Sequence, residues 1–190
     1  MRMRTSRIGG LLATASLATV ALALPASAIA APGGHAAPGK HHPRHRIGPC
    51  RASSTTIWLG LGAGGGTAGT IFYPLEFSNT GRRTCALFGF PGVAAVKNGH
   101  QVGGAAIRAG SKHLAVLRPG QTAHAVLGIV EAGNIPSCNM VQGANLKVFA
   151  PNQQASTIIP SFTFTACANR TVLRIRSVRF GVGIPGFNTP

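Results

Sequence analysis

Aspartate is absent from this 190-residue chain, and glutamate occurs only at Glu76 and Glu131. Hydrolysis by paired carboxylates needs two acids in one site, one protonated and one charged, and these two are far apart in the sequence. Glu76 alternates with the apolar Leu75 and Phe77, so we expect it to face solvent or to pair with an arginine. The scarcity of acids argues against an enzyme, and we expect neither catalytic residues nor a cofactor.

The histidines give little support to nucleophilic catalysis. Serine–histidine hydrolases commonly use an acid to orient the histidine, and no nucleophile-elbow sequence is present. His100, His113 and His124 have no local acidic partner, and such histidines are more often surface groups or satisfied groups than bases. An unrecognised hydrolase stays an alternative, which a buried Ser/His/Glu cluster in a cleft would favour.

Two glycine-rich segments fit nucleotide-binding spacings only in part. Gly60–Gly65 has the spacing of a dinucleotide-binding turn, but a strand-like segment follows it and no acid occurs about twenty residues further on. Gly34–Lys40 is spaced like a P-loop, yet His41 replaces the hydroxyl that would bind magnesium. We interpret both segments as loops.

Tryptophan and tyrosine are also scarce, with one of each, and no segment after residue 30 has long helical periodicity. Specific nucleic-acid binding uses stacking platforms or a helix in a groove, so we do not expect it. Basic residues dominate instead, since 18 Lys+Arg give a formal net charge of +16. Such a charge attracts anionic polymers and membrane surfaces.

The N-terminus has the pattern of a secretory signal peptide. Three arginines precede a stretch without charges at residues 8–24, and small residues follow at 25–30. A transmembrane anchor is the alternative, but glycine and small residues make the stretch weakly hydrophobic. We predict that residues 1–30 are removed, leaving no membrane span, and that the protein is secreted, as an extracellular or cell-wall-associated molecule.

Residues 31–48 are rich in Gly, Pro, His and basic residues, and we predict a disordered tail there. A second short tail is expected at 183–190. The first tail contains four histidines that suit loose capture of copper, nickel or zinc, namely His35, His41, His42 and His45. Trimming to Gly33 would create an N-terminal Gly-Gly-His site for copper or nickel. A solvated tail is the simpler interpretation, because that site depends on an additional cleavage.

Four cysteines, Cys50, Cys85, Cys138 and Cys167, fall in the remaining segment. An even number in an exported chain indicates two disulfides, whereas a zinc site needs close Cys pairs, which are missing. Pairing of consecutive cysteines predicts Cys50–Cys85 and Cys138–Cys167. The other two connectivities remain sterically open.

Residues 49–182 consist of short apolar runs separated by turn signals, which predicts a β-sandwich. The predicted strands are 55–59, 71–77, 93–96, 101–102, 115–117, 123–130, 146–149, 162–165 and 172–180. We expect one hairpin around Asn98-Gly99 and a second around Arg118–Gly120. Pro74 suggests an edge strand or a bulge.

The last predicted strand contains a candidate anion-binding face. Arg174 and Arg176 alternate with apolar residues, so both lie on one face of the strand. Arg179 joins them if the chain slips by one residue near Ser177. An ordinary solvated strand face is the alternative interpretation.

Several short motifs follow one another along the chain, namely Phe77-Ser78-Asn79-Thr80-Gly81, Thr84-Cys85, Phe90-Pro91-Gly92-Val93 and Leu117-Arg118-Pro119-Gly120. Their order resembles domain of unknown function 4232, a family of exported proteins and lipoproteins of actinobacteria. The resemblance runs from about Cys50 to Phe180. It implies an exported, immunoglobulin-like antiparallel sandwich without assigned catalytic residues. The lipid-attachment cysteine of some members is missing here.

These observations together predict a secreted, non-enzymatic binding or interaction domain. The charge favours an anionic cell-envelope polymer as its partner, and another secreted protein is the alternative partner. Extracellular metal capture by the histidine tail is the alternative function.

Overall fold

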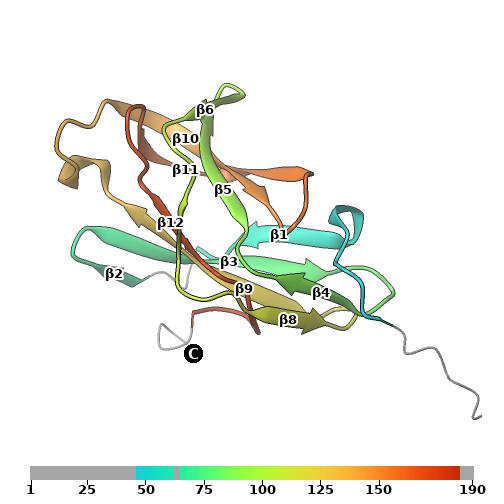
Figure 1. Ribbon diagram of the computed structural model, residues 1–190. Coiled ribbons are helices and arrows are strands. Elements are labelled where there is room, and N and C mark those ends of the chain that lie inside the picture. The colour runs from blue at the N-terminus through green and yellow to red at the C-terminus, as the bar shows by residue number, and fades with distance from the viewer. Residues whose placement is uncertain (1–45, 62–64, 185–190) are drawn as a thin grey trace, which may run out of the picture. The chain divides into compact units, whose positions relative to one another are not determined.

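The computed structural model describes residues 46–61 and 65–184 (Figure 1). The expected signal peptide, the four histidines of the tail and residues 185–190 lie outside the described residues. Within the described ranges, the only helical segments are two short 3-10 helices, η1 (Ala52–Ser54) and η2 (Ala132–Asn134). None of the described helices is long and apolar enough to cross a membrane.

The strands form three sheets. The largest has the order β1-β3-β9-β12-β7, with β2 added to β3 and β13 added to β9. Its strands are β1 (Thr55–Leu59), β2 (Gly65–Thr67), β3 (Thr70–Asn79), β7 (Ile107–Ala109), β9 (Thr122–Val130), β12 (Leu173–Arg176) and β13 (Arg179–Phe180). All of its pairings are antiparallel except β7 with β12.

The second sheet has the order β11-β10-β5-β6, and a third consists of β4 and β8. Their strands are β4 (Cys85–Phe88), β5 (Gly92–Lys97), β6 (His100–Val102), β8 (Leu114–Leu117), β10 (Met140–Phe149) and β11 (Ser156–Cys167). In Figure 1 the sheet of β5, β6, β10 and β11 lies above the sheet that contains β3 and β9. The predicted all-β sandwich is confirmed.

The core lies between the two larger sheets and follows the alternation of the strands. Leu75 and Phe77 of β3 and Leu127 of β9 point inward from the larger sheet and are fully buried. Leu146 and Val148 of β10 point inward from the second sheet and are also fully buried. Burying such a side chain contributes about 1.5–3 kcal/mol. The alternating pattern therefore determines which face of each strand packs inward.

One of the two predicted hairpins is confirmed. β5 and β6 pair with Lys97 opposite His100, and both Asn98 and Gly99 have positive φ, as a tight primed turn requires. The second predicted hairpin is wrong, because β8 pairs with β4 and β9 pairs with β3 and β12. The turn after Leu117 moves the chain from the small sheet to the large one instead of reversing it within one sheet.

The prediction of an edge strand or a bulge at Pro74 is also wrong, because β3 lies between β1 and β9 and pairs with β9 without a register shift. β1 and β2 pair with different parts of the same side of β3. The pairing with β1 reaches Leu75, which lies opposite Leu59, and the pairing with β2 reaches Phe72, which lies opposite Gly65. Pro74 lies in the gap between these two partners, and its carbonyl accepts a hydrogen bond from Gly60 N–H at 2.9 Å. The missing N–H of proline is tolerated there because no strand pairs with it on that side.

Both predicted disulfides are present, Cys50–Cys85 and Cys138–Cys167, and no described cysteine is free. Each closes a loop, with sequence separations of 35 and 29 residues. Loops of this size stabilise a fold by roughly 3–4 kcal/mol in the chain-entropy model. The cysteines therefore serve as crosslinks and not as zinc ligands.

The packed domain includes residues on both sides of the expected limits. The carbonyl of Gly48 accepts a hydrogen bond from Ala86 N–H at 2.9 Å, which fixes the segment before β1 along β4. At the other end Ile184 is buried, and Gly183 donates a hydrogen bond to Glu76. Residues 181–184 therefore belong to the packed domain.

Candidate anion-binding site

Four arginines line one open pocket beside the Cys50–Cys85 disulfide. The pocket has a volume of about 810 Å³, and the four arginines are Arg46, Arg51, Arg82 and Arg83. Two of them come from the segment before β1 and two from the loop between β3 and β4. We call this cavity the arginine pocket.

Backbone pairing holds the two arginine-bearing segments together. Cys50 N–H donates to Ala86 O at 3.0 Å, on the strand that begins at Cys85, and the disulfide crosslinks the same two segments. On the other side of the pocket, Thr80 N–H donates to Ser54 O at 3.0 Å. The walls of the pocket are therefore fixed by covalent and hydrogen bonds before any ligand arrives.

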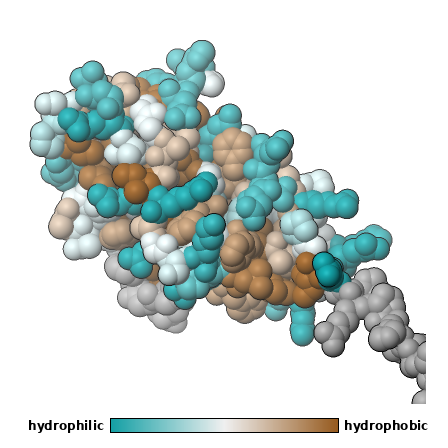
Figure 2. Space-filling view, viewed as in Figure 1, coloured by the Kyte–Doolittle hydropathy of each residue, from teal (hydrophilic) through white to brown (hydrophobic). Residues whose placement is uncertain are grey.

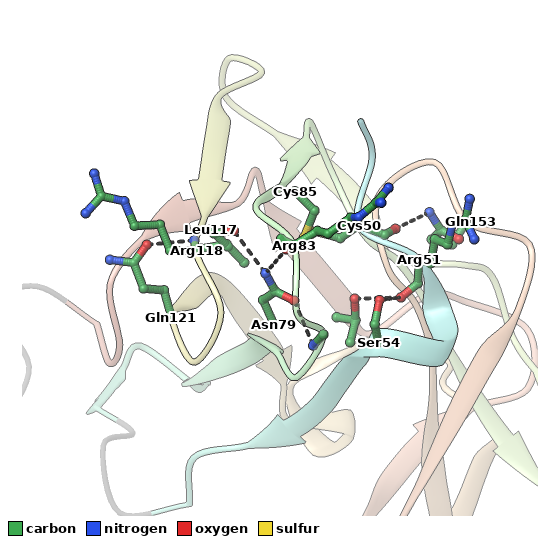
Figure 3. The surroundings of a disulfide bond; sticks show 12 residues. Cys50, Arg51, Ser54, Asn79, Arg83, Cys85, Leu117, Arg118, Gln121 and Gln153 are labelled. Carbon is green, nitrogen blue, oxygen red and sulfur yellow. Dashed lines mark hydrogen bonds between the residues drawn. A yellow bond between two sulfur atoms is a disulfide. The ribbon is translucent and has the colours of Figure 1, made fainter. Parts of the chain in front are cut away.

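Asn79 shapes the loop that contains Arg82 and Arg83 (Figure 3). Its side chain is buried, and its Nδ2 donates to Arg83 O at 2.9 Å and to Leu117 O at 3.0 Å. Its Oδ1 accepts a hydrogen bond from Gly81 N–H at 3.0 Å. A buried amide with three such bonds is costly to replace, so Asn79 is a positioning residue for the pocket.

No carboxylate side chain neutralises the arginine pocket. The sequence contains only Glu76 and Glu131. Glu76 is buried on another face of the domain, and Glu131 accepts a hydrogen bond from Asn134 Nδ2 at 3.2 Å beside η2. The four arginines are exposed, so their guanidinium groups are available to an anion from solution.

The three arginines predicted at the C-terminus share a face of the largest sheet. Arg174 lies opposite Gly128 and Arg179 opposite His124, and the β12–β13 side has one extra residue between these two pairs. The slip predicted near Ser177 is thus present, and the Ser177 hydroxyl donates to Gly89 O at 2.9 Å. Arg174, Arg176 and Arg179 are all exposed, as the alternation predicted.

This strand face is separate from the arginine pocket, since none of its three arginines lines that pocket. Arg179 donates from its guanidinium to Nε2 of His113 at 3.0 Å. Alternation in the sequence predicts the candidate site on the strand face formed by Arg174, Arg176 and Arg179. The arginine pocket depends on contacts between distant segments, so the sequence does not predict it, and the adjacent pair Arg82-Arg83 is its one local sign.

The sequence predicted that Glu76 faces solvent or pairs with an arginine, and this prediction is wrong. Glu76 lies opposite His124 on the outer face of the largest sheet, and both side chains are buried because residues 181–184 cover them. Burial raises the pKa of Glu76 to about 7, and a hydrogen bond from Gly183 N–H opposes this shift. Alternation identified the face correctly, but nothing local predicted its cover.

The described residues contain no group of three or more His, Cys, Asp or Glu side chains that could hold a metal ion. The proposed copper, nickel or zinc ligands His35, His41, His42 and His45 lie outside the described residues. Metal capture by the tail therefore stays a prediction from the sequence.

The fold and the pocket define a disulfide-bonded β-sandwich with a concave, arginine-rich surface. The profile of the family described as "Domain of unknown function (DUF4232)" matches residues 50–178. The chain belongs to this family. No curated protein and no solved structure matches the chain.

Proposed function

We propose that this chain is an extracellular, non-enzymatic binding domain that holds an anionic cell-envelope polymer in the arginine pocket. The observation that carries the proposal is the convergence of Arg46, Arg51, Arg82 and Arg83 on one concave opening without a carboxylate. Guanidinium groups donate paired hydrogen bonds to phosphate, sulfate or carboxylate oxygens. A repeating polyanion also gains from the release of counterions when it binds.

The pocket is favoured over the strand face for two reasons. A concave site surrounds an anionic group with donors from several directions, whereas Arg174 and Arg176 project from the exposed face of a single strand and line no part of this pocket. The walls of the pocket are also fixed in advance by the Cys50–Cys85 disulfide and by Asn79. Such preorganisation lowers the entropy that is lost on binding.

An extracellular location is supported by the two disulfides, which persist in oxidising compartments. The charge pattern of residues 1–30 supports export along the secretory route. Both features suit a partner outside the cell.

The test compares two variants that lose the same charge. Protein secreted from cells that express the full chain is titrated with long-chain polyphosphate and with polygalacturonate. Arg82→Ser/Arg83→Ser should weaken binding about tenfold more than Arg174→Ser/Arg176→Ser. The reason is that the loss of a hydrogen bond to a charged group costs about 1.5–3 kcal/mol, which corresponds to about a tenfold or larger loss of affinity. Equal losses would mean that net charge alone attracts the polymer and would overturn the proposed site.

Binding should also weaken steeply when salt is raised from about 0.1 M to about 1 M, because the Debye length falls from about 10 Å to about 3 Å. Failure of the wild-type protein to bind either polymer at the lower salt concentration would overturn the proposed function itself.

A further inference from the structure

A second basic pocket lies at the opposite end of β4 from the arginine pocket. It has a volume of about 410 Å³, and its lining includes two cations, Arg108 and Lys112, and three aromatic rings, Phe88, Phe90 and Phe149. We call it the phenylalanine pocket. It combines positive charge with flat apolar surface, whereas the residues that line the arginine pocket include no aromatic ring.

The two pockets are close neighbours with a fixed spacing. Cys85 lines the arginine pocket and Phe88 lines the phenylalanine pocket, and these residues begin and end the same strand, β4. Three residues of strand span about 10 Å. Gln153 of the phenylalanine pocket also donates from Nε2 to Cys50 O at 2.6 Å, which ties its wall to the disulfide. A separation of this size is within the length of a short stretch of an extended polymer.

The aromatic surface of the phenylalanine pocket is accessible. Phe88 is 47% exposed, and the neighbouring strand β8 exposes Leu114 at 62%. In the view of Figure 2, hydrophobic surface covers β4 and β8, with hydrophilic side chains along its margin. Lys147 Nζ lies 5.5 Å from the ring centroid of Phe149 and adds a third cation near this pocket. Phe88 thus offers an open ring face bordered by positive charge.

Two side-chain amides supply the polar groups of the pocket. Asn152 Nδ2 donates to Phe88 O at 3.3 Å, and Gln153 Nε2 donates to Cys50 O at 2.6 Å. These bonds orient both amides through their nitrogen atoms. No hydrogen bond between described residues uses the two amide oxygen atoms, which can accept hydrogen bonds from a ligand. A matching ligand therefore carries an anionic group, hydroxyl donors and a flat face of C–H groups.

An acidic sugar has all three features. We propose that the phenylalanine pocket binds an acidic sugar unit of the polymer whose neighbouring charge occupies the arginine pocket. The target is then an acidic polysaccharide, recognised by a sugar ring on Phe88 and by a carboxylate beside Arg108 and Lys112. This assignment rests on the proposed function, because it places both pockets on one chain of the polymer.

The experiment uses two polyanions that differ in whether they contain sugar rings, polygalacturonate and long-chain polyphosphate. Phe88→Ala should weaken binding of polygalacturonate about fivefold, or about 1 kcal/mol, and leave binding of polyphosphate unchanged, because only a sugar ring packs its C–H face on the aromatic ring. Phe88→Leu, which keeps an apolar side chain without a flat face, should have the same selective effect. Phe180→Ala, at another exposed phenylalanine, is the matched control and should change neither affinity.

Equal affinities of wild type and both Phe88 variants for polygalacturonate would overturn the sugar subsite while the arginine pocket stands. Equal weakening for both polymers would also overturn it, because the ring would then support the fold of the basic surface and not contact a sugar. If the Phe88 variants lose as much affinity for single-stranded DNA as for polygalacturonate, the ring stacks on bases, and a sugar-specific pocket is excluded. If the wild-type protein binds neither polymer, the proposed function itself is wrong.

Discussion

Glu76 on β3 lies directly opposite His124 on β9, and both side chains are buried although they point away from the core of the sandwich. Gly183 N–H donates to Oε1 of Glu76 at 2.7 Å, and Gly181 C=O accepts a hydrogen bond from Nδ1 of His124 at 3.0 Å. Oε2 of Glu76 and Nε2 of His124 have no hydrogen-bond partner among the described residues. The side chains of Glu76 and His124 therefore attach the segment 181–184 to the largest sheet by hydrogen bonds.

The stability of the fold should depend on the protonation of Glu76. Burial raises the pKa of Glu76 from an ordinary value of 4.5 to about 7, so the folded state binds this proton more tightly than the unfolded chain. The resulting stability is fully present below about pH 4.5 and is lost as the pH rises through about 7. The free energy of unfolding should therefore fall by about 1–3 kcal/mol between about pH 5 and about pH 8.

Glu76→Gln tests this dependence because it keeps an oxygen for Gly183 and removes the charge. Urea unfolding at a series of pH values should show a flatter profile for the variant and a higher free energy of unfolding than wild type at about pH 8. Glu131→Gln, at the exposed glutamate, should leave the wild-type profile unchanged. The same loss of stability with pH in both variants would contradict the assignment to Glu76.

Asn79→Ala should damage the fold and the arginine pocket together. The substitution leaves the carbonyls of Arg83 and Leu117 and the N–H of Gly81 without their side-chain partner. The expected loss is about 2–4 kcal/mol in free energy of unfolding, since each unsatisfied buried group costs about 1–3 kcal/mol. Gln101→Ala, at an exposed amide, is the control and should cost under about 1 kcal/mol.

Binding of polyphosphate by Asn79→Ala, measured well below its unfolding temperature, should be weaker than for wild type because the loop with Arg82 and Arg83 loses its anchor. Wild-type affinity in a destabilised Asn79→Ala variant would show that the loop keeps its shape without this amide.

The features that could be predicted from the sequence are those with a local cause. The Asn98-Gly99 turn requires two residues with positive φ, and it places β5 beside β6 without help from the rest of the chain. The alternation around Arg174 correctly placed its side chain on the exposed face. Pairing of consecutive cysteines was correct because each bridge joins segments that pair or lie next to each other in the fold.

The features that could not be predicted depend on contacts between distant segments. Glu76 occupies the expected face, but its burial is caused by Gly183, more than a hundred positions later. The arginine pocket joins Arg51 to Arg82 through a disulfide and a parallel bridge between Pro49 and Ala86. Alternation reports which way a side chain points and gives no information on what lies against it.

Export should be visible at the N-terminus of the mature protein. Cleavage within the small residues that follow the apolar stretch predicts that secreted material begins between Ile29 and Gly33. N-terminal sequencing of protein from the culture medium measures this position. An intact Met1, or protein that stays in the membrane fraction, would contradict the signal peptide.

The two disulfides should contribute similarly to stability and differently to binding. Cys50→Ser/Cys85→Ser and Cys138→Ser/Cys167→Ser each remove a crosslink of similar loop length, so each should lower the free energy of unfolding by roughly 2–5 kcal/mol. Only Cys50–Cys85 joins the two walls of the arginine pocket. The first variant should therefore bind polyphosphate less tightly than the second when both are measured at a temperature where they remain folded. Equal affinities would mean that the hydrogen bonds of Cys50 and Gly48 with Ala86 are enough to hold the walls together. The disulfide would then stabilise the fold without organising the site.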